Sequence, residues 1–183
     1  YTPPLVISRI HYHPDTSAVF PDDDKLEFLE ITNAGTANID LTGIYFGGTG
    51  LVYQFSAGAS LAAGAAIFLA SDSTTFRNKY GMAPFGQFTR NLSNADQNLL
   101  LSDAFGNEID HVHYYDDTPW PDADGNGKHL QLISVGLDNS LASSWTTAGN
   151  NTLGTDAPTP DRRVQVYPNP TTGQVRLHAE QRM

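Results

Sequence analysis

The sequence predicts an all-β fold, an immunoglobulin-like antiparallel β-sandwich with one short helix. Turn-forming residues are abundant, with 16 glycines and 11 prolines in 183 residues. About eight short apolar or alternating segments lie between turn signals spaced roughly eight to twelve residues apart. These two observations favour a sandwich of short strands, and a β-barrel is the main alternative.

Branched and aromatic residues mark the strands expected in the first half of the chain. In the segment 25–35, alternation places Glu27 on the face of Leu29 and Ile31, with Glu30 on the opposite face. The two carboxylates therefore do not converge into an acid–base pair. The expected strands are 5–14, 25–35, 39–48, 51–55 and 65–72.

One helix is expected directly after the segment 65–72. Asp72 or Ser73 can cap its first turn, and Phe76 and Tyr80 are spaced i, i+4 so that both can pack on the sandwich. Gly81 can end the helix in a left-handed conformation. The pattern predicts about two helical turns docked by aromatic side chains.

The second half of the chain resumes the strand pattern. The segment 98–115 predicts a hairpin, because two apolar runs flank a turn at 103–107. Shorter strands are expected at 128–134 and 143–148. The sequence thus divides into a sandwich over residues 1–148, a linker over 149–163 rich in turn formers, and residues 164–183, which restart a strand pattern but are too few to fold alone. We expect the last segment to be the beginning of an incomplete domain.

The composition excludes several classes of partner and chemistry. The net charge is −10, with 16 Asp, four Glu and ten Lys or Arg, so the chain shows no basic surface of the kind that binds nucleic acid. No cysteine is present, which excludes disulfides and thiolate chemistry. No apolar run reaches the length of a transmembrane helix. Because the chain begins at Tyr1, we expect a processed or excised polypeptide.

Residues 4–157 resemble the lamin tail domain in its bacterial secreted form. This resemblance implies an immunoglobulin-like β-sandwich that serves as an accessory module of an exported protein. Chromatin binding, a role of the animal domains, is not expected of so acidic a chain. The stretches that carry the resemblance are LVISRIHYHP, KLEFLEITNAGTANIDLTGIYF, LSNADQNLLLSDAFGNEIDHVHYYDD and WPDADGNGKHLQLISVGLDNSLASSWTTA.

A second resemblance lies near the end of the chain. Residues 164–177, VQVYPNPTTGQVRL, are similar to the start of the sorting domain used by type IX secretion in Bacteroidetes-like bacteria. The similarity covers only the first part of that domain, so this chain is not expected to sort itself. It implies a parent protein that is exported to the cell surface or released.

The stretch DADGNGK follows the first half of a calcium loop. Asp122, Asp124 and Asn126 fit positions one, three and five, Gly127 fits the glycine at six, and Lys128 supplies a backbone carbonyl at seven. The interpretation as a calcium site competes with a plain turn, in which the same side chains cap backbone N–H groups.

The position-twelve ligand of that loop is missing. A bidentate Glu is required there, and the chain has Ile133. The remaining oxygens would have to come from Asp116, Asp117 or Asp138, the nearest acids in sequence. No other cofactor is expected.

Two histidine pairs have the i, i+2 spacing that places both rings on one face of a strand. They are His11 with His13 and His111 with His113. A zinc site needs at least a third ligand. We expect solvated surface histidines, with Val112 facing the core between the second pair. The acidic run 21–25 is expected to be a solvated loop tip.

The aromatic residues allow two interpretations. Trp120 and Trp145 can be core anchors. Alternatively, Trp120, Tyr114 and Tyr115 form an exposed cluster that stacks on sugar rings, as in carbohydrate-binding sandwiches.

The sequence therefore favours a non-catalytic binding module of an exported bacterial protein, mediating surface attachment or protein–protein contacts. A calcium-assisted carbohydrate-binding module and an accessory domain of a secreted hydrolase are the alternatives. The chain lacks the local motifs of serine hydrolases, zinc proteases and P-loop enzymes, so we do not expect it to be an enzyme, whatever its full-length parent does. The expected partner is a protein or a cell-surface glycan, at the extracellular or outer surface of a Bacteroidetes-like bacterium.

Overall fold

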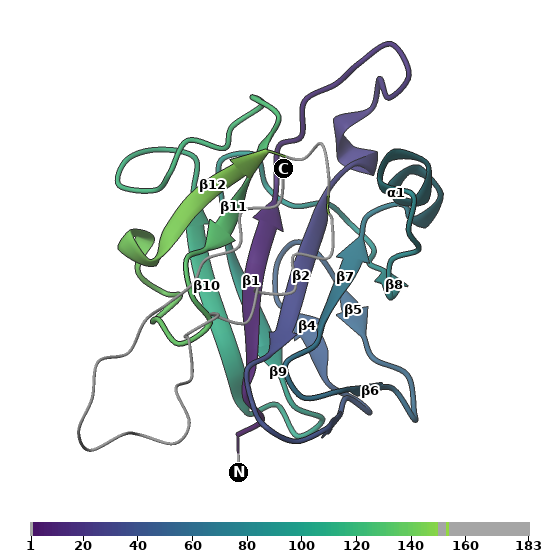
Figure 1. Cartoon of the computed structure of the whole chain (residues 1–183), viewed down its shortest axis with the longest axis vertical. Coiled ribbons are helices and arrows are strands. Elements are labelled where there is room, and N and C mark those ends of the chain that lie inside the picture. Colours follow the sequence, from purple (N-terminus) through teal and green to yellow (C-terminus); the bar gives the residue numbers. More distant parts are fainter. Residues whose placement is uncertain (1, 150–152, 154–183) are drawn as a thin grey trace, which may run out of the picture. The chain divides into compact units, whose positions relative to one another are not determined.

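The computed structural model describes residues 2–149 and 153, which form a sandwich of two main β-sheets (Figure 1). This confirms the predicted all-β, immunoglobulin-like class. The strands are β1 (Leu5–His11), β2 (Phe28–Asn33), β3 (Ile39–Asp40), β4 (Tyr45–Gly47), β5 (Tyr53–Gln54), β6 (Ser60–Leu61), β7 (Ala66–Ala70), β8 (Gly86–Gln87), β9 (Asp96–Ser102), β10 (Glu108–Tyr115), β11 (Lys128–Leu132) and β12 (Trp145–Gly149). One α-helix, α1 (Ser73–Tyr80), and two 3₁₀ turns, Asp23–Lys25 and Ala142–Ser144, complete the fold.

The two sheets have different sizes and strand orders. The larger sheet runs β12-β11-β1-β2-β7-β8, and the smaller runs β10-β9-β4-β5. Strands β3 and β6 pair separately. Neighbouring strands are antiparallel except for β7 and β8, which run parallel. Strand β1 therefore lies inside the larger sheet, hydrogen-bonded to β2 on one side and to β11 on the other.

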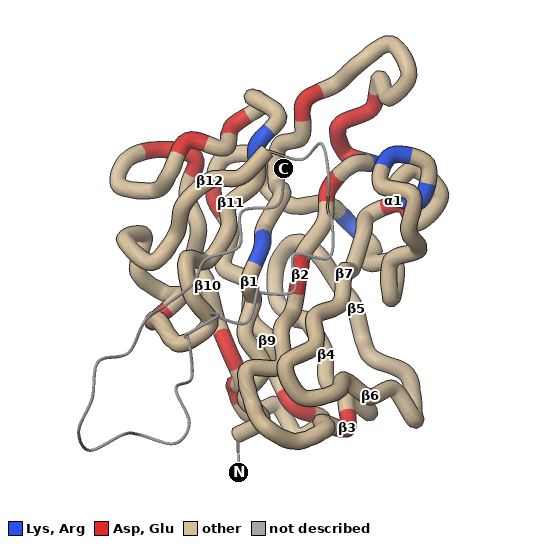
Figure 2. Tube along the Cα trace, in the orientation of Figure 1, with Lys and Arg blue, Asp and Glu red and all other residues tan. Residues whose placement is uncertain are grey.

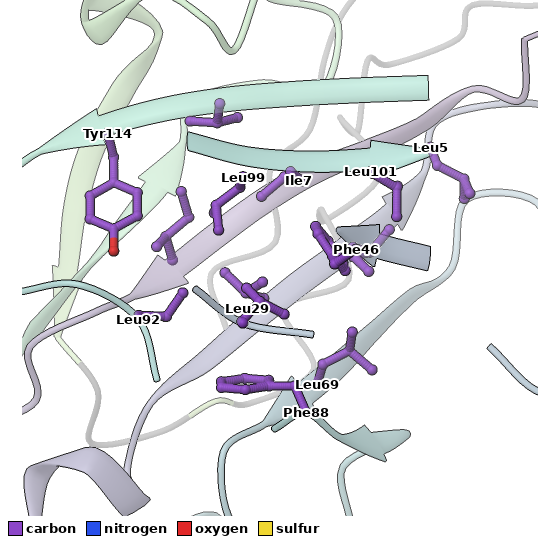
Figure 3. Close-up of a cluster of buried hydrophobic side chains, with 14 of the residues drawn as sticks. Leu5, Ile7, Leu29, Phe46, Leu69, Phe88, Leu92, Leu99, Leu101 and Tyr114 are labelled. Atoms are coloured by element: carbon purple, nitrogen blue, oxygen red, sulfur yellow. The ribbon is translucent and has the colours of Figure 1, made fainter. Parts of the chain in front are cut away.

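The hydrophobic core lies between the two sheets (Figure 3). Ile7 from β1 and Leu29 from β2 meet Leu99 and Leu101 from β9 and Phe46 from β4, and all five are buried. Burial of aliphatic and aromatic surface from both inner faces is the main stabilising contribution in a sandwich. The alternation read in the sequence thus points its apolar faces inward.

A polar staple crosses between the sheets at a bulge in β1. The pairing of β1 with β2 shifts between Ile7 and Arg9, and the Ile7 N–H donates to Asp110 Oδ2 of β10 at 2.7 Å. Asn139 Nδ2 donates to the same carboxylate at 2.8 Å and to the Ile7 carbonyl at 3.2 Å. The Trp145 indole N–H donates to the Asn139 carbonyl at 2.8 Å. Backbone groups freed by the bulge are therefore satisfied by side chains from β10 and from the connection between β11 and β12.

The expected strand 39–48 was wrong in one respect, because the chain turns in the middle of it. Asp40 Oδ1 accepts the Thr42 N–H at 2.9 Å, and the Ile44 N–H returns to the Leu41 carbonyl at 3.0 Å. Gly43 takes the left-handed φ of 77° that the turn requires. The segment thus yields β3 and β4, which belong to different sheets.

The predicted helix and hairpin are confirmed. Asp72 caps α1 by accepting the Thr75 N–H at 2.7 Å, and Gly81 ends the helix at φ 71°. Strands β9 and β10 pair around the expected turn, where Asp103 Oδ1 accepts the backbone N–H groups of Phe105 and Asn107. Local capping chemistry therefore decided both elements, as the sequence indicated.

The described residues belong to one unit that ends at Leu153. Leu153 lies within the predicted linker 149–163, yet it is buried against the aromatic cluster of Phe28, Phe68 and Phe76. Residues 164–183, including the segment similar to a sorting domain, lie outside the described residues. Within the described ranges, no helix is both long and apolar enough to span a bilayer.

Candidate functional site

Two connecting segments, 12–25 and 116–127, meet at one end of the sandwich, which we call the loop end (Figure 1). Together they contain eight aspartates and one lysine, and the acidic residues stand out there in Figure 2. Connecting loops at the end of a sandwich are common sites of recognition, because the sheets hold them in fixed positions.

The predicted calcium loop uses its side chains to hold its own backbone. Asp122 Oδ1 accepts Asn126 Nδ2 at 2.9 Å and the Asp124 N–H at 3.4 Å. Asn126 Oδ1 accepts the Lys128 N–H at 3.2 Å. Gly127 has a φ of 74°. These hydrogen bonds are those of the turn interpretation, and they occupy oxygens that a calcium ion would need.

Asp124 points away from the loop and contacts the ring of His13. Its Oδ1 forms a hydrogen bond with His13 Nδ1. On the other side of the ring, His13 Nε2 is 3.6 Å from Asp23 Oδ2. The Gly125 N–H also donates to the His13 carbonyl at 3.0 Å. His13 therefore joins the loop after β10 to the acidic run 21–25, in which Asp23–Lys25 form a 3₁₀ turn.

The other acids proposed to complete a calcium site are divided. Asp116 lies near the buried Tyr12 hydroxyl, as Asp122 and Asp124 do. Burial first, and then the negative charges of these three carboxylates, raise the pKa of Tyr12. Asp138 instead accepts the Ser140 N–H at 3.0 Å in the β11–β12 connection.

The described part of the chain contains no group of three or more His, Asp or Glu side chains placed to hold a metal ion. Position twelve, Ile133, is an exposed aliphatic residue. The side chains at the loop end therefore fit a braced turn better than a metal cage.

The alternative of an exposed aromatic cluster is wrong for two of its three members. Trp120 is buried against Trp145, with ring centroids 5.9 Å apart, so it is the core anchor of the other interpretation. Tyr114 is also buried, stacked on Tyr12 at 4.9 Å, and its hydroxyl donates to the Ser93 carbonyl at 2.7 Å. Only Tyr115 is exposed, because alternation on β10 turns it outward.

The expectation for His111 and His113 is confirmed. Both rings are exposed on β10, while Val112 between them is buried. His111 contacts Glu108 at 2.7 Å and His113 contacts Asp96 at 2.9 Å.

The expectation of a solvated His11 was wrong. His11 is fully buried on the outer face of the larger sheet, where the β1–β11 register places it opposite His129. The two ring centroids are 5.9 Å apart, and both rings pack on Phe28. None of the four ring nitrogens has a hydrogen-bond partner among the described residues. Burial therefore lowers the pKa of His11 well below its usual value, and that of His129 to about 4.

Sequence reasoning missed the state of Glu27. Its Oε2 accepts the Leu92 N–H at 2.9 Å, while Oε1 has no partner among the described residues. Burial raises the pKa of Glu27 to about 9, so the carboxyl is protonated at neutral pH. The signal was present, because alternation placed Glu27 on the core face with Leu29. Glu30 does lie on the opposite face, bonded to Ser8 at 2.7 Å.

The fold and the loop end together define a β-sandwich module whose connecting loops are braced by side-chain hydrogen bonds. The lamin tail domain family matches residues 1–116, more than half of the chain, and the chain belongs to this family. Among solved structures it is similar to a DUF4876 family protein from Bacteroides thetaiotaomicron VPI-5482, with a TM-score of 0.53 and 10% identity. That match covers 82% of this chain and 69% of the other, and it shows the fold alone. No curated protein matches the chain.

Proposed function

We propose that this chain is a non-catalytic binding module of an exported bacterial protein, and that its loop end mediates surface attachment or protein–protein contacts. The observation that carries the proposal is the contact of Asp124 with His13, which joins two distant loops into one braced surface. A surface that is rigid before binding loses less conformational entropy when a partner docks. Membership in the lamin tail domain family supports a module role.

The charge of the loop end favours a basic protein surface as the partner. Eight aspartates against one lysine create a negative potential, which speeds encounter with a positively charged partner and repels nucleic acid. Such an association weakens as salt screens the charges. A cell-surface glycan is the second class of partner, and Tyr115 is the exposed member of the aromatic trio that would serve it.

The proposal can be tested by binding of the fluorescently labelled chain to intact bacterial cells. Asp24→Asn combined with Asp117→Asn removes two exposed charges at the loop end, and we expect several-fold weaker binding with a smaller dependence on salt. The matched control, Asp40→Asn with Glu108→Gln, removes two charges elsewhere on the molecule and should bind as the wild type does. Equal binding by both double variants would refute a role for the loop end.

Export by type IX secretion is part of the same proposal. It is supported by the similarity of residues 164–177 to the start of a sorting domain. We therefore propose an extracellular or outer-surface location in a Bacteroidetes-like bacterium. Protease treatment of intact cells should degrade the native protein while a cytoplasmic marker survives; protection of the protein would contradict this location.

Calcium binding is a second candidate, and one observation favours it. Asp122, Asp124, Asn126 and Gly127 keep the order of the first half of a calcium loop, and the side chains of Asp122, Asp124 and Asn126 are exposed. A calcium ion bound only by the native state would raise the melting temperature by several degrees at saturating concentration. The shift should disappear with EGTA and in Asp124→Ala. An unchanged melting temperature at millimolar calcium would leave the loop as a turn.

A further inference from the structure

The connection between β11 and β12 exposes more aliphatic surface than any comparable stretch of the described chain. Ile133, Val135, Leu137 and Leu141 are 58%, 41%, 44% and 52% exposed. Scattered exposed apolar side chains are normal, but four within nine residues form a patch. Such patches commonly mark interaction surfaces.

This connection is locked in place, so the aliphatic side chains are held outward. Two consecutive turns close it, with the Leu137 N–H donating to the Ser134 carbonyl at 3.0 Å and the Leu141 N–H to the Asp138 carbonyl at 3.3 Å. Within the second turn, the buried Asn139 side chain is anchored in the staple that crosses the sandwich. A rigid apolar surface keeps its full area available to a partner at low entropic cost.

The patch adjoins β12, which is the edge strand of the larger sheet (Figure 1). No strand in the described part of the chain pairs with its outer edge, so N–H and C=O groups there are open to another strand. Edge strands are usually guarded by charged residues. β10, the edge of the smaller sheet, carries Glu108, Asp110 and two histidines, whereas residues 129–149 contain a single charged residue, Asp138.

We propose that the outer edge of β12 and the four aliphatic residues beside it, together the β12 surface, form the docking site for a second copy of this chain. Two β12 strands would pair antiparallel across a twofold axis, a contact that is self-complementary. This inference rests on the proposed interaction role and extends it to self-association.

The charge distribution selects a second copy as the occupant. Each chain carries a net charge of −10, so two copies repel each other over most of their surfaces and can approach where acids are nearly absent. The β12 surface meets that condition. Salt screens the remaining repulsion, so self-association should strengthen as salt rises. Docking of a basic partner would show the opposite dependence on salt.

Sedimentation equilibrium of the full chain over a range of concentrations, at low and at high sodium chloride, tests the proposal. We expect a monomer–dimer equilibrium that tightens with salt, and a dimer weakened more than about tenfold by Ile133→Asp with Leu137→Asp. Val19→Asp, a charge added at a residue that is 77% exposed in the loop end, is the control and should dimerise normally. Unchanged thermal unfolding would show that the variants are folded.

The strand arrangement has a separate test, because the chain contains no cysteine. Thr147 lies at the middle of β12, so Thr147→Cys should form a disulfide between copies, while Tyr115→Cys on the other sheet should not. A monomer at all concentrations and salts would overturn the inference, as would a dimer indifferent to Leu137→Asp. If such a monomeric chain still bound cells through its loop end, the proposed function would stand without self-association.

Discussion

Histidines on the outer faces of the two sheets lie in opposite environments, buried on the larger sheet and exposed on the smaller. On the larger sheet, α1 and Leu153 cover an aromatic cluster, and His11 and His129 are buried there without hydrogen-bond partners among the described residues. Among the described residues, no helix covers the outer face of the smaller sheet, and His111 and His113 are exposed there beside carboxylates.

The difference teaches that the covering element, and not the strand pattern, fixes the chemistry of an outward side chain. His11/His13 and His111/His113 have identical spacing in the sequence. The helix that shields His11 begins more than sixty residues later, at Ser73. A covered imidazole loses its hydration and stays neutral, whereas an exposed imidazole keeps water and can gain a carboxylate partner.

Removing the cover should produce the largest effect. Phe76 is fully buried, and its ring centroid lies 5.9 Å from that of Phe28. Phe76→Ala should lower the free energy of unfolding by about 3–5 kcal/mol, the usual range for deleting a buried aromatic ring. Denaturant unfolding measures this, with Tyr115→Ala on the uncovered face as the control, expected to lose less than about 1 kcal/mol. Equal losses would erase the distinction between the two faces.

Glu27 extends the comparison to a buried carboxyl. Its folded pKa of about 9 lies above the unfolded value of 4.5, so its contribution to stability is full below pH 4.5 and is lost as pH rises toward 9. Glu27→Gln cannot ionise and keeps an acceptor for the Leu92 N–H. It should therefore stabilise the fold at pH 7 by on the order of 3 kcal/mol, and by more at pH 8.5.

Unfolding of wild type and Glu27→Gln at pH 4.5, 7 and 8.5 tests this sign. A gain that is the same at every pH would show that Glu27 is ionised in the folded protein. Glu108→Gln, on the exposed strand end, should show no comparable gain.

His129 tests the covered face directly. Its folded pKa of about 4 lies below the unfolded value of 6.5, so the unfolded chain binds the proton more readily. Stability is therefore full above pH 6.5 and is lost as pH falls toward 4. Between pH 6.5 and 5 the loss from this residue should be about 2 kcal/mol.

The measurement uses His129→Leu, which removes this pH-dependent loss, in the Glu27→Gln background, which removes the opposing contribution of the carboxyl. His11 acts in the same direction. Burial first, and then the charges of His129 and Lys79, lower the pKa of its ring, so protonation of the unfolded chain at falling pH again costs the fold stability. If the free energy of unfolding of His129→Leu fell with pH as steeply as before, the buried His129 ring would not have a lowered pKa in the folded protein.

The exposed pair should give the smallest effect. His113 contacts Asp96, and both side chains are about half exposed. His113→Gln should change the free energy of unfolding by less than about 0.5 kcal/mol, because solvent screens such surface pairs. A loss above about 1 kcal/mol would show that the outer face of the smaller sheet is more tightly packed than its exposure indicates.

Sequence reasoning succeeded where local chemistry decides the structure. The Asp72 cap, the Gly81 stop and the turn after Asp103 all depend on neighbours within a few residues. The inward direction of Val112 followed from alternation. Sequence reasoning failed where the contacting residues are far apart along the chain. Nothing near Asp124 in sequence indicates His13, which lies 111 residues away.

The aromatic site illustrates a different limit. A Trp between two prolines is compatible with a surface platform or a core anchor, and only the position of Trp145 distinguishes them. Likewise, Tyr114 has an aromatic ring of the kind that stacks on sugars, but it lies two residues after Val112 on β10 and so faces the core as Val112 does. Parity was therefore the better guide, because the pleat of a strand fixes direction whatever the side chain.

The central place of β1 has a consequence for the order of events during synthesis. Ile10 pairs with Leu130, so the first strand cannot complete its hydrogen bonding until 120 further residues have emerged. Contacts of such long range make folding slow and leave a strand edge open to misassembly in the meantime. The part of the chain that matches the family, residues 1–116, ends before β11 begins. A polypeptide that ended at residue 116 would lack β11, so one edge of β1 would stay unpaired permanently.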